Sequence, residues 1–161
     1  MSVTKFNTKG KIKVISGSVL NPEMAGLRFV LNAVNTAGKT DSKLEDLIDK
    51  KWKKVKAEVR GWFVNKTGAY KLGAVNTTAV QSDVWVVNML CKDDKAAMSA
   101  DGLKTCLSEV AKMAKTEQAS VHISNLLLQE MPDGQNLINK YFVDNGLLVC
   151  LYDEDSSVKR T

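Results

Sequence analysis

Apolar positions along the chain alternate between two spacings, and the change of spacing predicts a regular succession of strands and helices. Short apolar runs bounded by turn residues are typical of strands, whereas apolar residues three and four positions apart indicate one buried face of a helix. The predicted strands cover residues 11–19, 26–35, 69–80, 83–91, 120–128 and 146–152. The predicted helices cover residues 41–60, 101–115 and 133–143.

The helix over residues 41–60 has the clearest pattern. Its apolar residues recur at spacings of three and four, at Leu44, Leu47, Ile48, Trp52, Val55 and Val59. Asp41 or Ser42 is a suitable N-cap, and Arg60-Gly61 is a suitable end. The remaining polar positions of this segment are mostly lysines, so the predicted outer face is basic.

This order of elements predicts an α/β fold with three layers, in which helices cover both faces of a mixed, mostly parallel sheet. The nearly continuous apolar run DVWVVNMLC over residues 83–91 is typical of a central strand buried on both sides. The length of 161 residues suits a single domain, with residues 1–10 and 154–161 expected to be flexible. Ligands of such sheets bind beyond the carboxyl ends of the strands, which directs attention to the loops at 18–22, 35–41, 91–100 and 128–134.

Composition restricts the setting in which this domain works. Charged residues make up 25% of the chain and apolar residues 44%, as in ordinary globular proteins. No apolar run reaches the roughly 18 residues of a membrane span, and the N-terminus lacks a secretory h-region, so a cytoplasmic location and no membrane contact are expected. The three cysteines lie in apolar stretches and should be buried thiols, and His122 should be a packed core residue. No metal site and no cofactor are predicted, because no ligand cluster can be assembled.

Two local phrases carry a resemblance to a known family. GSVLNP follows the first predicted strand and NAVN ends the second. With the order of elements, they resemble the macrodomain family, and in particular its compact branch, which hydrolyses ADP-ribose esters on acidic side chains. The resemblance runs from about residue 11 to residue 152. It implies a partner of the ADP-ribose kind, either the small molecule or an ADP-ribosylated protein.

The resemblance also implies a set of ligand-binding positions. The family's first strand ends in Gly-Asp, whose carboxylate holds the adenine, and here Ser18 replaces the acid. Asn32 and Asn35 match the family's asparagine-rich strand end, with Asn35 as a ribose contact. The family's glycine-rich phosphate loop corresponds to residues 36–40, where the phosphate contacts are predicted at Gly38, Lys39 and Thr40.

Lys92 falls where the compact branch has its nucleophilic lysine. A lysine nucleophile must be partly deprotonated, and the neighbouring Asp93 and Asp94 should instead raise the pKa of Lys92. The alternative is an ordinary lysine at a strand end in a solvated loop. The family's partner acid lies in a glycine-rich loop after the fifth strand; here that loop has leucines, and only Glu130 or Asp133 could supply the acid. These departures favour binding without turnover over hydrolysis.

A second function follows from the charge. The net charge is +5, and much of it lies in the predicted helix 41–60, at Lys50, Lys53, Lys54 and Lys56. A solvated polar face is the simpler explanation, and the alternative is a surface whose few phosphate contacts would give weak, salt-sensitive nucleic-acid binding. The alternative function is therefore a non-catalytic interaction or nucleic-acid-binding protein that kept the scaffold and lost the ligand site. Small size and divergent loops suit an accessory protein of a phage or another mobile element.

Overall fold

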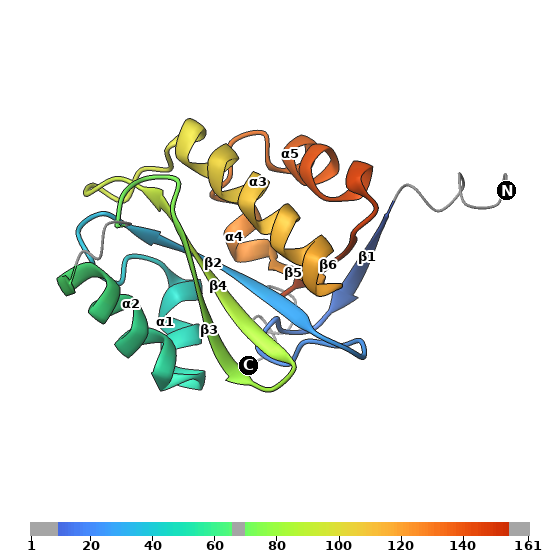
Figure 1. Cartoon of the computed structure of the whole chain (residues 1–161), viewed down its shortest axis with the longest axis horizontal. Coiled ribbons are helices and arrows are strands. Elements are labelled where there is room, and N and C mark those ends of the chain that lie inside the picture. The colour runs from blue at the N-terminus through green and yellow to red at the C-terminus, as the bar shows by residue number, and fades with distance from the viewer. Residues whose placement is uncertain (1–9, 66–69, 155–161) are drawn as a thin grey trace, which may run out of the picture.

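A computed structural model describes residues 10–65 and 70–154 of the chain, and these form one six-stranded sheet with helices on both faces (Figure 1). The strands are β1 (Lys11–Ser16), β2 (Arg28–Asn35), β3 (Val75–Gln81), β4 (Val84–Lys92), β5 (Ser120–Ser124) and β6 (Leu148–Asp153). The helices are α1 (Lys43–Lys51), α2 (Lys53–Asn65), α3 (Ala100–Glu117), α4 (Asn125–Leu128), α5 (Gly134–Tyr141) and the 3₁₀ helix η2 (Val143–Asn145).

The strand order across the sheet is β1-β6-β5-β2-β4-β3. All neighbouring pairs are parallel except β3 and β4, which a tight turn joins into an antiparallel hairpin at one edge. Helices α1 and α2 lie on one side of the sheet and α3 and α5 on the other, as Figure 1 shows. The predicted three-layer fold with a mixed, mostly parallel sheet is confirmed.

The two central strands are enclosed because helices cover both of their faces. Seven of the eight residues of β2 are buried, and so are eight of the nine residues of β4. Alternation of polar and apolar residues is absent from such strands, which explains why both read as continuous apolar runs. These strands carry their polar C-terminal residues, Asn35 and Lys92, to the same edge of the sheet, where the two are register partners.

The predicted bounds differ most from the structure in four elements, the first being the strand over residues 11–19, which ends at Ser16. The helix over residues 41–60 is two helices, because the backbone leaves the helical region at Trp52 (φ −128°, ψ 86°), although its predicted apolar face is buried except at the half-buried Leu47. The strand over 120–128 ends at Ser124, whose hydroxyl accepts from the backbone N–H of Leu126 and caps helix α4. The strand over 69–80 begins at Val75, and residues 66–69 lie outside the described part.

The ends of the described chain are held in place. The N–H of Gly10 donates to the carbonyl of Val143 at 2.6 Å, and Glu154 is buried. Parallel pairing of β1 with β6 accompanies these contacts. The expected flexibility of residues 1–10 and 154–161 stays a prediction, and residues 1–9 and 155–161 lie outside the described part.

The core contains the residues that the sequence assigned to it. The thiols of Cys91, Cys106 and Cys150 are buried and free, and His122 is buried between Ser120 and Tyr152, with ring-nitrogen contacts of 2.7 and 2.8 Å to their hydroxyl oxygens. Within residues 10–65 and 70–154, no group of side chains could hold a metal ion. None of the helices that the structure describes is both long and apolar enough to span a membrane.

Candidate functional site

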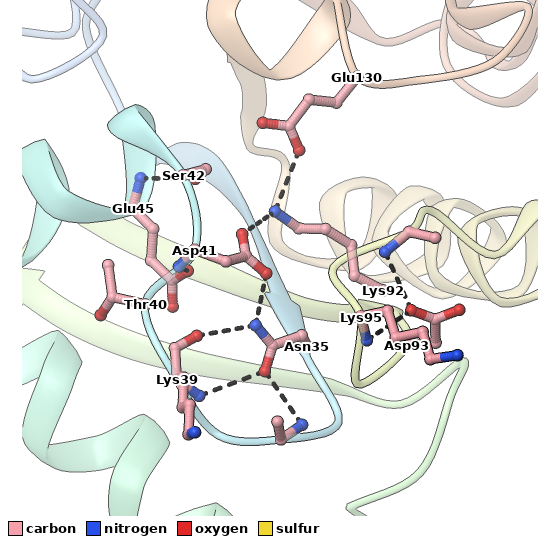
Figure 2. A network of polar contacts seen from close by, with 12 residues as sticks. Asn35, Lys39, Thr40, Asp41, Ser42, Glu45, Lys92, Asp93, Lys95 and Glu130 are labelled. Carbon is pink, nitrogen blue, oxygen red and sulfur yellow. Dashed lines mark hydrogen bonds and ion pairs between the residues drawn. The ribbon is translucent and has the colours of Figure 1, made fainter.

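Lys92 lies at the carboxyl end of β4 and points between two loops (Figure 2). Its Nζ is 2.5 Å from Oδ1 of Asp41, in the loop between β2 and α1, and 3.0 Å from Oε1 of Glu130, after α4. Its side chain is only 2% exposed. The alternative of a solvated lysine at a strand end is therefore wrong, because two carboxylates and the end of the sheet enclose the ammonium group.

The pKa of Lys92 lies above its ordinary value. Burial alone would lower it, but the hydrogen bonds and the charges of Asp41 and Glu130 outweigh the loss of water. The sequence predicted a raised pKa for Lys92 but attributed it to the wrong acid. The carboxylate of Asp93 accepts hydrogen bonds from the backbone N–H groups of Lys95 and Ala97 instead. The lysine at this site is thus a protonated cation at neutral pH.

The side chain of Asn35 shapes the loop that carries Asp41. Its Oδ1 accepts from the N–H groups of Ala37 and Lys39, at 3.0 and 3.2 Å, and its Nδ2 donates to the Lys39 carbonyl at 2.8 Å. Nδ2 also donates to Oδ2 of Asp41. All these bonds lie inside the loop, so Asn35, predicted as a ribose contact, folds the loop instead of presenting its amide to solvent.

Glu45 supports the same loop from the first turn of α1. Ser42 caps this helix by accepting from the N–H of Glu45, and Oε1 of Glu45 accepts from the N–H of Asp41 at 3.2 Å. The arrangement is a capping box moved by one residue. Burial raises the pKa of Glu45 to about 7, although the Asp41 N–H works in the opposite direction.

A pocket of about 270 Å³ opens beside this loop. Its lining carries both signs of charge and consists of Gly38, Lys39, Thr40, Glu45, Asp49, Lys56, Val59 and Arg60. The predicted phosphate-contact residues are therefore together on one wall of a hollow. Within this lining the Thr40 hydroxyl donates to Asp49 at 3.1 Å, which fixes the end of the loop to α1.

Ser18 lies at the far end of the same sheet edge, after β1. Its hydroxyl donates to Oε1 of Glu154 at 2.7 Å and accepts from the N–H of Leu20 at 3.1 Å. Parallel register pairs Ser16 with Asp153, so the residue after β6 comes next to the loop after β1. The carboxylate that residue 18 lacks is thus present beside it, on Glu154.

Of the remaining predicted site residues, Lys56 lines the pocket beside the Asn35–Asp41 loop and the others lie elsewhere. Asn32 is 1% exposed inside the sheet and donates to Asn88 at 3.0 Å, so its predicted ligand contact does not fit its position. Lys50 pairs with Asp46 on the surface of α1 at 3.2 Å. The remaining lysines of the predicted basic face are exposed on α2, at positions 53, 54 and 56, and Lys54 donates to the carbonyl of Ala79.

Two acids of the site were missed by the sequence, since Asp41 was predicted only as a helix cap and Glu154 only as part of a flexible end. Glu130 was one of the two acids that the sequence offered, and it does contact Lys92. Asp133, the other substitute, instead accepts from Asn136 at the start of α5. The signal that could have identified Asp41 is its place in the loop between β2 and α1, because such loops lie at the ligand-binding edge of the sheet.

Comparison with known proteins gives the fold. No protein-family model matches the chain, and no curated protein matches it in sequence. Among solved structures, a macrodomain protein from Streptomyces coelicolor is similar over 89% of this chain and 99% of its own, with 24% identity and a TM-score of 0.82. The macrodomain of Mycobacterium tuberculosis DarG has 16% identity and a TM-score of 0.70, over 89% and 97% of the two chains.

Another similar structure is Thermosipho africanus DarTG in complex with ADP-ribose, with 14% identity and a TM-score of 0.68. The match covers 89% of this chain and 43% of that one. The chain therefore has the macrodomain fold, with a sequence far from that of these structures. The resemblance found in the sequence is confirmed at the level of the fold.

Proposed function

Because the chain has the macrodomain fold, we propose that it binds ADP-ribose or a related nucleotide derivative at the carboxyl edge of its sheet. The observation that carries the proposal is the meeting of Lys92 with the Asn35–Asp41 loop at the ends of β4 and β2. Parallel α/β sheets bind ligands at this edge. A structure with the same fold, that of DarTG, holds ADP-ribose.

The three parts of such a ligand correspond to three parts of the edge. The exposed ammonium of Lys39, with Lys56 and Arg60 in the same pocket lining, suits the phosphates, since the N–H groups of Gly38 and Lys39 already donate to Asn35. At the other end, the Ser18–Glu154 pair suits the base, because a carboxylate accepts from an exocyclic amino group. Lys92 and its two acids lie where the resemblance puts the distal ribose.

Binding without turnover is the form of the proposal that the site favours. A nucleophilic lysine must lose its proton, and the two carboxylates at Nζ stabilise the protonated form. If hydrolysis occurs, Lys92 is the residue that we expect to attack the distal ribose carbon, with Glu130 as the neighbouring acid. The ester would then be cleaved slowly compared with the binding step.

Calorimetric titration with ADP-ribose tests the proposal. We expect heat and a thermal shift with the wild-type chain, weaker binding with Glu154→Gln and Lys39→Ala, and unchanged binding with Lys112→Ala on the opposite helix layer. ADP and ribose 5-phosphate as separate ligands would divide the contributions of the two ends. No heat and no thermal shift at millimolar ADP-ribose would refute the proposal.

One observation supports the second function, a nucleic-acid contact. Exposed basic side chains of α2 continue into the pocket beside the Asn35–Asp41 loop through Lys56 and Arg60. We expect such a surface to bind DNA or RNA weakly and with strong salt dependence. Replacing Lys50, Lys53 and Lys56 by Glu should abolish this binding at low salt. Replacing Lys104, Lys112 and Lys115 of α3 is the matched control, and an equal loss there would contradict a specific surface.

A further inference from the structure

We propose that Asp41 is a positioning residue of the Lys92 site, which holds the lysine ammonium fixed between two loops and prevents it from acting as a nucleophile. The inference rests on the proposed function only in taking this edge as the ligand site. Asp41 supplies one of the two carboxylates at Nζ, and Glu130 supplies the other (Figure 2).

The two acids are held to different degrees. The Asp41 side chain is 14% exposed, its second oxygen accepts from Asn35, and its backbone N–H donates to Glu45. Glu130 is 36% exposed and reaches Nζ from the turn after α4. Asp41 is therefore the fixed partner, because Asn35 of its own loop and Glu45 of the following helix hold it in place.

The electrostatic surroundings of Lys92 act in the same direction. The charged or titratable groups that face it are Asp41 and Glu130 from the two loops, Glu45 from α1, and the buried Cys91 thiol, preceding it on β4. Burial is the one factor that favours the neutral amine, and it is outweighed. The lysine is thus a fixed cation, and a ligand must displace Asp41 before the amine can attack carbon.

Asp93 provides the matched control within the chain. It directly follows Lys92 in sequence, yet its carboxylate closes a turn with the N–H groups of Lys95 and Ala97, at 2.9 and 3.0 Å. Removal of its charge tests the effect of a nearby carboxylate that does not contact Nζ. Asp41→Asn and Asp93→Asn therefore differ in contact with the ammonium group, not in the charge removed.

Reductive methylation of the folded chain with formaldehyde and a borohydride measures the lysine directly, without ligand. The rate at Lys92 is followed by peptide mass spectrometry from pH 8 upward, relative to the exposed Lys95. In Asp41→Asn we expect the midpoint of the pH profile to fall by about one to two units, because one opposite charge in contact is lost. Asp41→Glu should restore the wild-type midpoint, and Asp93→Asn should leave it unchanged.

Glu130→Gln keeps the test decisive even if Asp41→Asn does not fold. With Asp41 in place, Lys92 of Glu130→Gln should still be methylated more slowly than the exposed Lys95 at every pH tested, because one carboxylate still holds its ammonium. Equal rates at Lys92 and Lys95 in this variant would mean that Asp41 does not hold the lysine, and they would overturn the proposal. So would equal shifts in Asp41→Asn and Asp93→Asn. A chain that passes this test and fails to bind ADP-ribose would refute the proposed function while leaving the role of Asp41 intact.

Discussion

The amide of Asn35 makes four hydrogen bonds inside one loop, and this is the densest polar contact set at the sheet edge. A carboxamide suits this position because it both donates and accepts, which neither a carboxylate nor a hydroxyl does with two atoms in one plane. The Tyr70 hydroxyl adds a bond to the Asn35 carbonyl at 2.5 Å. The loop is therefore organised before any ligand arrives.

Replacement of Asn35 by Ala should lower the free energy of unfolding by about 1–3 kcal/mol, because the part-buried N–H groups of Ala37 and Lys39 lose their acceptor and the loop loses four hydrogen bonds. Binding of ADP-ribose should fall as well, since the loop then has no fixed shape. Chemical denaturation and calorimetry measure the two effects. Asn136→Ala, which removes an exposed amide bonded to Asp133, should change neither. A wild-type affinity in Asn35→Ala would contradict a preformed loop.

At the scale of elements, the Asn35–Asp41 loop packs against helix α2 at Gly38. Gly38 has a φ of 70°, and a Cβ there would lie 2.6 Å from the ring of Phe63 on α2. Gly61, two residues earlier on α2, has open space where a Cβ would be placed. Replacing glycine by alanine is therefore expected to destabilise the fold at Gly38 and to stabilise it at Gly61.

Gly38→Ala should destabilise the fold by at least ~1 kcal/mol, from the left-handed backbone and from displacement of Phe63. Gly61→Ala should stabilise it by about 0.5–1 kcal/mol, as alanine does within a helix. Thermal and urea unfolding of the two variants measure both signs. Equal behaviour of the two variants would show that the loop does not pack on α2 as described.

At the scale of the whole molecule, two buried titratable groups make opposite contributions to stability. Burial, with the charge of Arg28, lowers the pKa of His122 to about 4, so the folded chain binds fewer protons than the unfolded chain between pH 4 and 6.5. Its contribution to stability is lost as pH falls through this range. Glu45, raised from 4.5 to about 7, takes up a proton on folding, and its contribution is lost as pH rises through that range.

These slopes largely cancel between pH 4.5 and 6.5, so the two groups should leave the stability of the wild-type chain nearly flat there. Glu45→Gln keeps the acceptor for the Asp41 N–H and removes the titration. Its stability should rise with pH by up to ~3 kcal/mol between pH 4 and 6.5, the part due to His122. Denaturant unfolding across this range measures the slopes, and parallel pH curves for both chains would contradict a buried, protonated Glu45.

The sequence by itself determined the layers of this protein and the edge where its chemistry lies. Apolar spacing fixes which residues must leave water, and for β2, β4 and α3 local spacing and tertiary packing agree. It also placed Lys92 and the Asn35–Asp41 loop at strand ends, since the ends follow from the apolar runs. Local spacing was less informative at Trp52, where the backbone leaves the helical region, and at Ser124, where a hydroxyl cap ends the strand and begins α4.

Only the tertiary structure decided what surrounds Lys92 and Ser18. The lysine meets Asp41 and Glu130 across 51 and 38 positions of sequence, and Ser18 meets Glu154 across 136. Such pairs depend on the order of strands in the sheet and on how each loop folds, and neither leaves a local pattern. The neighbouring letters Asp93 and Asp94 therefore suggested the wrong acids for Lys92, because adjacency in the chain does not set the direction of a side chain.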